Sequence, residues 1–166
     1  MNAKQIIKQL GLRPHPVEGG YYLETYRSEE MIPVVGLPAR YEGTRNFSTT
    51  IFYLLTPKTF SAIHRLPTDE TFHFYLGDPV EMLHLFEDGS TQRYILGHDI
   101  LNGHEVQLMV PRMVWQGCRL KRGGKYALMG CTVAPGFDFN DYKTARRDEL
   151  TERYPHEKKL ITSLTK

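Results

Sequence analysis

The sequence predicts a mainly β fold, an antiparallel sandwich or barrel. After residue 19, about nine segments rich in aromatic and β-branched residues follow one another without a helical pattern between them. Turn signals containing glycine, proline or asparagine separate these segments. A chain of 166 residues, 40% of them hydrophobic and 24% charged, is long enough to form one domain of this kind around a core.

The N-terminal segment is predicted to be a short helix. Residues 2–10 carry apolar side chains at helical spacing, and Gly11 provides a stop. The proline-containing residues 13–16 cannot continue a helix, because proline lacks the amide donor and pushes the preceding residue out of the helical region. The first helix is therefore expected within residues 1–12.

The strands that follow are predicted to differ in how many of their faces are buried. Residues 105–110 alternate polar and apolar side chains, so one face of that strand should contact water. Residues 51–55 are apolar on both faces and need cover from a second sheet or a partner subunit. A homodimer would supply that cover. The predicted strands cover residues 20–27, 47–55, 59–64, 70–76, 80–86, 91–96, 105–110, 113–120 and 125–133.

The end of the chain returns to a helical pattern. Residues 145–153 contain good helix formers, and Pro155 can begin another short helix. No linker or internal repeat interrupts the chain. We expect a single domain over residues 1–166 with a helical C-terminus over residues 143–166.

The charge balance disfavours a nucleic-acid partner. Lys and Arg number 21 against 19 Asp and Glu, which gives a net charge of +2 and no broad basic surface. No apolar run approaches the roughly 20 residues that span a bilayer. Lys4 and Lys8 interrupt what would have to be the core of a signal peptide. We expect a cytoplasmic protein without a membrane partner.

The two cysteines are expected to be free thiols. Cys118 and Cys131 lie on either side of residues 121–125, where two glycines predict a hairpin turn. On that register Cys118 would face Met129 and Cys131 would face Gln116, so the two sulfurs would not meet.

His64 and Glu70 are the first candidate site residues. A strand that ends near His64, a short loop and a strand that begins at Glu70 would place both side chains on neighbouring strands, about 5 Å apart at the β-carbons. Such a pair can hold a divalent metal or act as an acid and a base. The alternative is a strand-end glutamate that stays solvated or bonds His64.

Strand alternation divides the residues after Glu70 into two sets. Phe72, Phe74 and Leu76 should share the face of Glu70, whereas His73 should point away from it, into an inter-sheet or dimer contact. A bulge near Asp69 would reverse this assignment of His73.

Several other polar residues have structural interpretations. The segment around His15 and Glu18 indicates a turn that leads into the first long strand. His84 shares a face with apolar neighbours and is interpreted as structural. The basic residues near Arg146 have carboxylates beside them and indicate a solvated helix face.

The spacing of the candidate residues resembles two motifs of the cupin superfamily. His64, Leu66, Glu70 and Gly77 are placed like the two histidines, the glutamate and the glycine of the first motif. Residues 111–116 are similar to the second motif, in which a turn proline precedes a metal-binding histidine. Further segments are similar to the fifth cupin family, small proteins of uncharacterised function, over about residues 10 to 155. These segments are residues 14–22, 24–28, 73–79, 114–117 and 132–137.

The resemblance implies a double-stranded β-helix, the cupin jelly-roll barrel, usually paired as a dimer. It also shows departures from metal-binding cupins. Leu66 replaces a histidine, Met113 replaces a glycine, and Gln116 replaces the histidine of the second motif. Only His64 and Glu70 keep a strong ligand type, so no tightly bound metal is expected. A weakly bound divalent metal would use His64, Glu70 and Gln116, joined by His73 if that residue faces inward.

Two classes of function follow. The first is a metal-independent isomerase, epimerase or lyase that acts on a small polar metabolite such as a carbohydrate derivative, with His64 and Glu70 as catalytic residues and Gln116 on a substrate oxygen. The second is a binding module that captures a small ligand without turnover. A metal-dependent dioxygenase is disfavoured because its ligand set is incomplete. In either class the expected ligand-binding residues are Gln116, Phe72, Phe74, Trp115 and His73.

Overall fold

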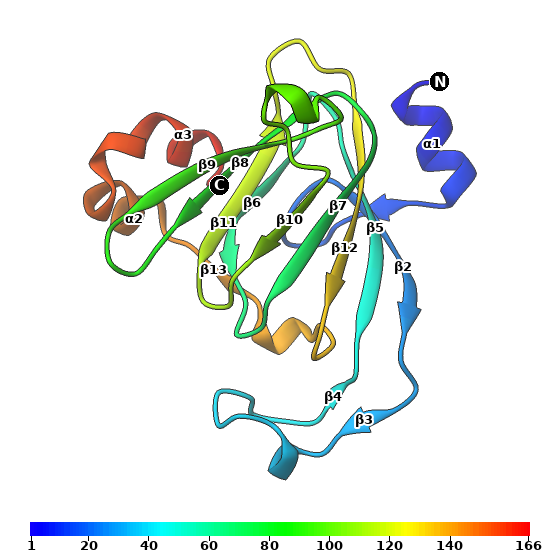
Figure 1. Cartoon of the computed structure of the whole chain (residues 1–166), viewed down its shortest axis with the longest axis vertical. Helices are drawn as coiled ribbons and strands as arrows, with labels where there is room; N and C mark the ends of the chain where they lie inside the picture. Colours follow the sequence, from blue (N-terminus) through cyan, green and yellow to red (C-terminus); the bar gives the residue numbers. More distant parts are fainter.

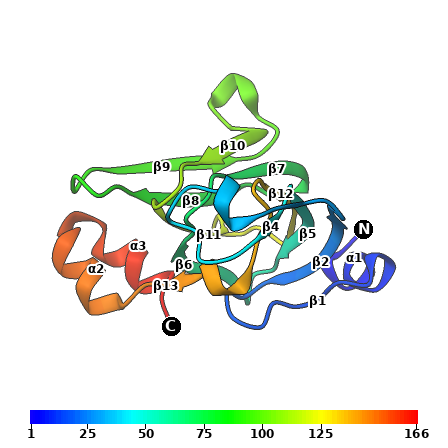
Figure 2. The same cartoon turned by 90° about the horizontal axis from the view of Figure 1, so that it is seen from below.

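The computed structural model describes residues 1–166 and is mainly β, with 13 strands that pair antiparallel. Two sheets face each other, and a small two-stranded ladder extends from them as part of an arm (Figures 1 and 2). In order across the first sheet, the six strands are β1 (Arg13–Pro14), β2 (Tyr21–Arg27), β5 (Thr49–Leu55), β12 (Ala127–Val133), β7 (Glu70–Gly77) and β10 (Gln107–Val110). The second sheet has five strands: β13 (Lys143–Thr144), β6 (Phe60–Arg65), β11 (Trp115–Leu120), β8 (Val80–Leu85) and β9 (Thr91–Leu96). The arm carries β3 (Met31–Ile32) and β4 (Arg45–Asn46).

Successive strands often change sheet, which corrects the predicted hairpin at residues 121–125. β11 belongs to the five-stranded sheet and β12 to the six-stranded sheet, so the turn between them crosses the molecule. Cys118 pairs in its ladders with Met82 and Ser61, and Cys131 pairs with Ile51 and Phe72. Both thiols are buried and free. The crossing is consistent with a jelly roll, but the two sheets stay separate and do not close into a barrel.

A bulge in β7 corrects the predicted faces of that strand. Phe74 pairs with Met129 and Leu76 with the adjacent Leu128, so Tyr75 is an extra residue without an opposite partner. The extra residue reverses the alternation. Phe72 and Phe74, which precede the bulge, keep the predicted inner face, whereas Leu76 packs on the outer face of the six-stranded sheet.

The main core fills the space between the two sheets. It combines fully buried side chains of both layers, such as Tyr53 and Phe72 from one sheet and Met82 from the other. α1 (Ala3–Leu10) covers part of the outer face of the six-stranded sheet by packing Ile6 near Leu54. The rest of that face is left without cover by this chain (Figure 1).

The C-terminal helices cover the outer face of the five-stranded sheet. They are α2 (Arg147–Arg153), the 3₁₀ turn η4 (Pro155–Glu157) and α3 (Lys158–Ser163). Lys143–Thr144 pairs with β6 as β13, so the helical part begins later than the predicted residue 143. None of the helices combines the length and the apolar content needed to span a lipid bilayer.

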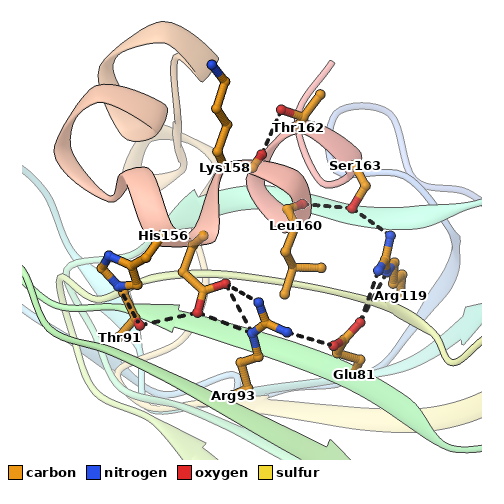
Figure 3. Close-up of polar contacts among 10 residues, drawn as sticks. Glu81, Thr91, Arg93, Arg119, His156, Lys158, Leu160, Thr162 and Ser163 are labelled. Atoms are coloured by element: carbon orange, nitrogen blue, oxygen red, sulfur yellow. Dashed lines mark hydrogen bonds and ion pairs between the residues drawn. The ribbon is translucent and has the colours of Figure 1, made fainter.

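A polar network joins these helices to the sheet, as Figure 3 shows. Arg93 Nη2 lies 2.6 Å from Glu157 Oε2, and Arg119 Nη2 lies 3.1 Å from Glu81 Oε2. Arg119 also donates a hydrogen bond of 2.7 Å to Ser163 Oγ on α3. Each carboxylate of this network contacts a cation, so the network stabilises the packing of the helices on the sheet.

Candidate functional site

The candidate site is a cavity of about 380 Å³ between the two sheets. Residues of β1, β2, β5, β6, β7 and β12 line it, together with the segment that follows β12. Its deepest polar residues are His64 and Glu70, which are both almost completely buried. A cavity of this size that combines apolar walls with a few polar groups is typical of a small-molecule site.

His64 and Glu70 reach this cavity from opposite sheets, which corrects the prediction that they lie on neighbouring strands. His64 lies on β6 of the five-stranded sheet and Glu70 begins β7 of the six-stranded sheet. Gln116 on β11 bridges them, because its Nε2 lies 2.8 Å from His64 Nε2 and 3.0 Å from Glu70 Oε2. Gln116 itself is 2% exposed and lies behind the cavity rather than in its lining.

The orientation of the His64 ring follows from its neighbours. Its Nδ1 lies 2.8 Å from the carbonyl oxygen of Ala62, which can only accept, so Nδ1 carries the proton. Its Nε2 then accepts an N–H from Gln116. The Tyr142 ring stacks on the imidazole with a centroid distance of 4.6 Å and fixes its plane. The cavity thus holds an imidazole in a fixed orientation, with its Nε2 directed at Gln116.

Glu70 differs from an ordinary carboxylate. Burial, and then the negative charge of Glu18, raise the pKa of Glu70 to about 8, and hydrogen bonds from Cys131 and Gln116 only partly oppose this rise. Glu70 is therefore a carboxylic acid at neutral pH and can donate a proton. A base at His64 and an acid at Glu70, held by one shared amide, can perform acid–base chemistry on a small molecule.

Glu18 and His15 also contribute to the cavity, although their segment was interpreted as a turn. The turn itself is present, since the Glu18 amide donates a hydrogen bond of 2.9 Å to His15 Nδ1. The carboxylate of Glu18 accepts from Ser61 and lies 4.0 Å from His64 Nε2. Burial lowers the pKa of His15. The only signal in the sequence was the family-like segment of residues 14–22.

Charged side chains of β2, and aromatic side chains of β2 and of the segment after β12, also line the cavity. Arg27 forms two hydrogen bonds with Glu24, of 2.9 and 2.7 Å, so these two charges compensate each other. The aromatic side chains at the cavity are Tyr22, Phe137 and Phe139.

The three aromatic residues predicted to bind ligand lie elsewhere. Phe72 and Phe74 are part of the core between the sheets and do not line the cavity. Trp115 faces the C-terminal helices and lies beneath the guanidinium of Arg65, 4.5 Å from its ring centroid. Phe72 and Phe74 lie further along β7 than Glu70, and Trp115 lies on the other face of its strand.

His73 does not join the site, which corrects its inclusion among the ligand-binding residues and the metal ligands. The ladder between β7 and β12 runs without a bulge from Glu70 to His73, so alternation places His73 on the outer face. There its Nε2 lies 3.2 Å from Thr132 Oγ1 and its Nδ1 lies 3.2 Å from Gln107 Nε2.

His84 is buried in the interior, directly opposite Gln116 in the ladder of β8 and β11. Burial lowers the pKa of His84 to about 4, so it is neutral at pH 7. Its Nε2 lies 3.3 Å from the sulfur of Met82. This environment agrees with the structural interpretation of His84.

The residues at this place do not fit the transition-metal site of metal-binding cupins. Leu66 offers no ligand atom, and Gln116 directs its amide nitrogen, not its oxygen, at His64 and Glu70. No group of three or more His, Cys, Asp or Glu side chains is placed to hold a metal ion. The donor set therefore lacks the three or four strong ligands of such a site.

Comparisons with known proteins show the family of this chain. The family model described as "Cupin_5: Cupin superfamily (DUF985)" matches residues 4–145. The uncharacterized protein YML079W of Saccharomyces cerevisiae is 33% identical over 156 residues, which are 89% of this chain and 77% of that protein.

Solved structures give the same result. A hypothetical protein from Leishmania major has a TM-score of 0.88 and 31% identity, covering 99% of both chains. Protein SO0799 from Shewanella oneidensis has a TM-score of 0.86 and 32% identity, covering 100% of this chain and 98% of that one. A single-residue variant of oxalate decarboxylase from B. subtilis has a TM-score of 0.53 and 15% identity, over 92% of this chain and 37% of that chain, and therefore shares the fold alone.

Proposed function

Because the chain belongs to the Cupin_5 family of the cupin superfamily, we propose that it binds a small polar metabolite between its two sheets and transfers a proton on it. His64 and Glu70 are the proposed catalytic residues, and the reaction class is that of a metal-independent isomerase, epimerase or lyase. The observation that carries this proposal is a pair of proton-transfer groups at one cavity: the imidazole of His64 and the carboxyl group of Glu70, whose pKa is raised, lie 2.8 and 3.0 Å from the same amide. Enzymes use two groups in such different states as the base and the acid of one reaction.

The cavity favours a polar ligand with hydroxyl or carbonyl groups. Glu70 offers a donor and Glu18 an acceptor at its depth, and the walls near Ile51 and Val133 are apolar. A carbohydrate derivative has both kinds of surface, because its hydroxyl groups bond carboxyl groups and its ring carbons pack on apolar side chains.

A binding module without turnover is the second candidate function, and one observation favours it. The basic Nε2 of His64 is occupied by an N–H of Gln116, so a substrate must displace this hydrogen bond before His64 can accept a proton. If no ligand displaces it, the three side chains act only as hydrogen-bond partners.

The test has two steps. Native mass spectrometry of freshly purified protein identifies any retained small molecule, which is then incubated with the protein in D₂O. Deuterium incorporation at a ligand carbon supports proton transfer, and binding without incorporation supports the binding module. His64→Ala and Glu70→Gln should each abolish incorporation, whereas Glu149→Gln, at an exposed helix position, should leave it unchanged.

The proposal includes the absence of a tightly bound transition metal. His64 and Glu70 alone provide too few strong ligands to retain iron, zinc or manganese. Elemental analysis after dialysis against a chelator should give much less than one metal ion per chain. A stoichiometric metal after this treatment would contradict the metal-independent mechanism.

We also propose that the protein is a homodimer that buries the outer face of the six-stranded sheet. Tyr75 and Met109 are 41% and 52% exposed on this face, beside the half-buried Phe52. α1 covers only part of the sheet, and a second copy would cover the apolar remainder. Light scattering at micromolar protein should give the mass of two chains. A single monomer mass, or a dimer unaffected by Met109→Lys, would contradict this interface.

A further inference from the structure

A second cavity lies on the other side of β6 from the candidate site. It has a volume of about 200 Å³. The end of β6, β13 and residues 40–45 of the arm, which lead into β4, contribute to its walls. The two cavities share only Leu66 in their linings. Cations outnumber carboxylates around the second cavity: Arg40, Arg45, Arg65 and Lys143 against Glu42 and Asp141.

Two of these cations oppose each other directly. Lys143 on β13 and Arg65 on β6 are partners in the antiparallel ladder, so their side chains stand next to each other on one face. Neither forms an ion pair with a carboxylate of the chain. Like charges in this arrangement are destabilising, so the native protein retains a repulsion that an anion between them would remove.

Arg65 is held in place without its full set of hydrogen bonds. Its guanidinium lies over the ring of Trp115 at 4.5 Å, which fixes its plane. Its Nε is buried and has no hydrogen-bond partner. A buried cationic donor without an acceptor is costly, and such groups in native proteins commonly have a ligand or water partner.

The other groups around the cavity leave the positive charge uncompensated. Arg40 donates from Nε to the Pro67 carbonyl at 2.7 Å, which directs this arginine while its terminal nitrogens stay free. Arg45 is neutralised by Asp141 in a buried ion pair. Glu42 is the remaining carboxylate at the cavity, and it is exposed and forms no ion pair. Three cations therefore face a single solvated carboxylate.

The backbone at the cavity is also unusual. Met113 has a φ of +65°, the only positive φ of a non-glycine residue in the chain, and its side chain lines the cavity. Its amide donates a hydrogen bond of 2.8 Å to the Leu66 carbonyl, which holds this conformation. The Val114 amide bonds the Pro111 carbonyl at 3.2 Å, so this φ belongs to a tight turn that brings the Met113 side chain to the cavity.

From the opposed cations and the unpartnered Arg65 Nε, we propose that this second cavity binds a phosphate group. Arginine presents two parallel donors that match the oxygens of phosphate, and lysine adds a point charge. A phosphate dianion balances the net charge of the cavity better than a carboxylate, which has one charge. The ligand is inorganic phosphate or the phosphate group of a small metabolite.

Inorganic phosphate is the probe for the test, with acetate as the monoanion control at constant ionic strength. Saturable shifts of the Arg65 Nε–H resonance and of the Lys143 amide in ¹⁵N–¹H NMR spectra, with a Kd of about 1 mM or lower, would support the site. Arg65→Gln and Lys143→Gln should each weaken phosphate binding about tenfold or more. Arg146→Gln is the matched control, because this arginine is exposed and paired with Asp148 outside the cavity.

Several outcomes would overturn the proposal. These are the absence of saturable shifts up to about 20 mM phosphate, acetate binding as tight as phosphate binding, and equal loss of binding in the Arg146 variant. Lys143→Gln keeps the test valid if Arg65→Gln fails to fold, because Lys143 is exposed. Glu70→Gln should leave phosphate binding unchanged, which separates this site from the candidate active site.

Discussion

Glu70 and Asp141 are both buried carboxylates, 9% and 8% exposed, but their partners are opposite in kind. Asp141 accepts two hydrogen bonds from Arg45, from Nε at 2.8 Å and from Nη2 at 2.5 Å. Glu70 has no cation; it accepts from the amide of Gln116 at 3.0 Å and from the thiol of Cys131. The charge of Asp141 is thus balanced by Arg45, whereas no cation offsets the desolvation of Glu70.

The difference separates a structural carboxylate from a functional one. A buried charge with a bidentate partner anchors two segments, here the arm at Arg45 and the turn after β12 at Asp141. A buried carboxyl without a cation contributes little to stability and has its pKa raised, which is useful only if it exchanges a proton or bonds a ligand. Four variants test this distinction, each at a carboxylate with a different environment.

The largest effect is expected for Asp141→Asn. The substitution leaves the buried guanidinium of Arg45 without its counter-charge, and losing one member of such a pair costs about 3 to 5 kcal/mol. Urea unfolding at pH 7 measures this change. A loss below about 1 kcal/mol would show that Arg45 finds another partner and that the ion pair is not a structural anchor.

Glu70→Gln should instead increase the free energy of unfolding above neutral pH. The folded protein binds the Glu70 proton more tightly than the unfolded chain does, because the pKa rises from 4.5 to about 8. The native protein therefore loses stability as the pH rises from about 4.5 to about 8, by roughly 3 to 5 kcal/mol in total, while the variant does not. The free energy of unfolding measured from pH 4 to pH 9 gives both curves. Parallel curves would mean that Glu70 is not protonated in the native state.

Glu157→Gln should have an intermediate effect. Glu157 is buried beneath the C-terminal helices, but its partner Arg93 is 51% exposed and can be solvated when the pair is lost. We expect a loss of about 1 to 2 kcal/mol, seen as a lower thermal midpoint without any change in ligand binding. A stability loss as large as that of Asp141→Asn would show that an exposed cation is as destabilising as a buried one when its carboxylate partner is removed.

Asp148→Asn should have the smallest effect. Asp148 and its partner Arg146 are both mostly exposed at the start of α2, where water replaces the ion pair. No measurable change in the thermal midpoint is expected at physiological salt. A clear shift would mean that the charge stabilises the N-terminus of α2 through the helix dipole rather than through Arg146.

The sequence was sufficient to predict the strands and the family but not the sheet to which each strand belongs. Alternation and turn residues are local, so the segment at residues 91–96 agrees with β9. The pairing of β11 and β12 depends on the crossing between sheets, which a two-glycine turn does not encode. The bulge at Tyr75 has a similar cause, because its register is set by the partner strand β12.

Only part of the candidate site could be predicted, because local patterns do not show which distant segments meet. His64, Glu70 and Gln116 were indicated by spacing, and the structure brings them together. Glu18 escaped notice because its segment precedes β6 by about 40 residues and also forms an ordinary turn, so no local pattern reveals that it reaches His64. The aromatic residues were misplaced because alternation specifies a face of a strand but not a depth along it.

The strand β6 separates the two cavities, so its length and register matter for both of them. His64 and Arg65 are consecutive, and they face two different cavities because successive side chains of a strand point in opposite directions. Replacing one side chain changes one cavity. Deleting one residue between Ser61 and His64 would exchange the two faces and bring the guanidinium of Arg65 to the place of the imidazole, whereas inserting one residue would bring Ile63 there. Recombination with a homologue should therefore tolerate sequence divergence in this segment but not a change in its length.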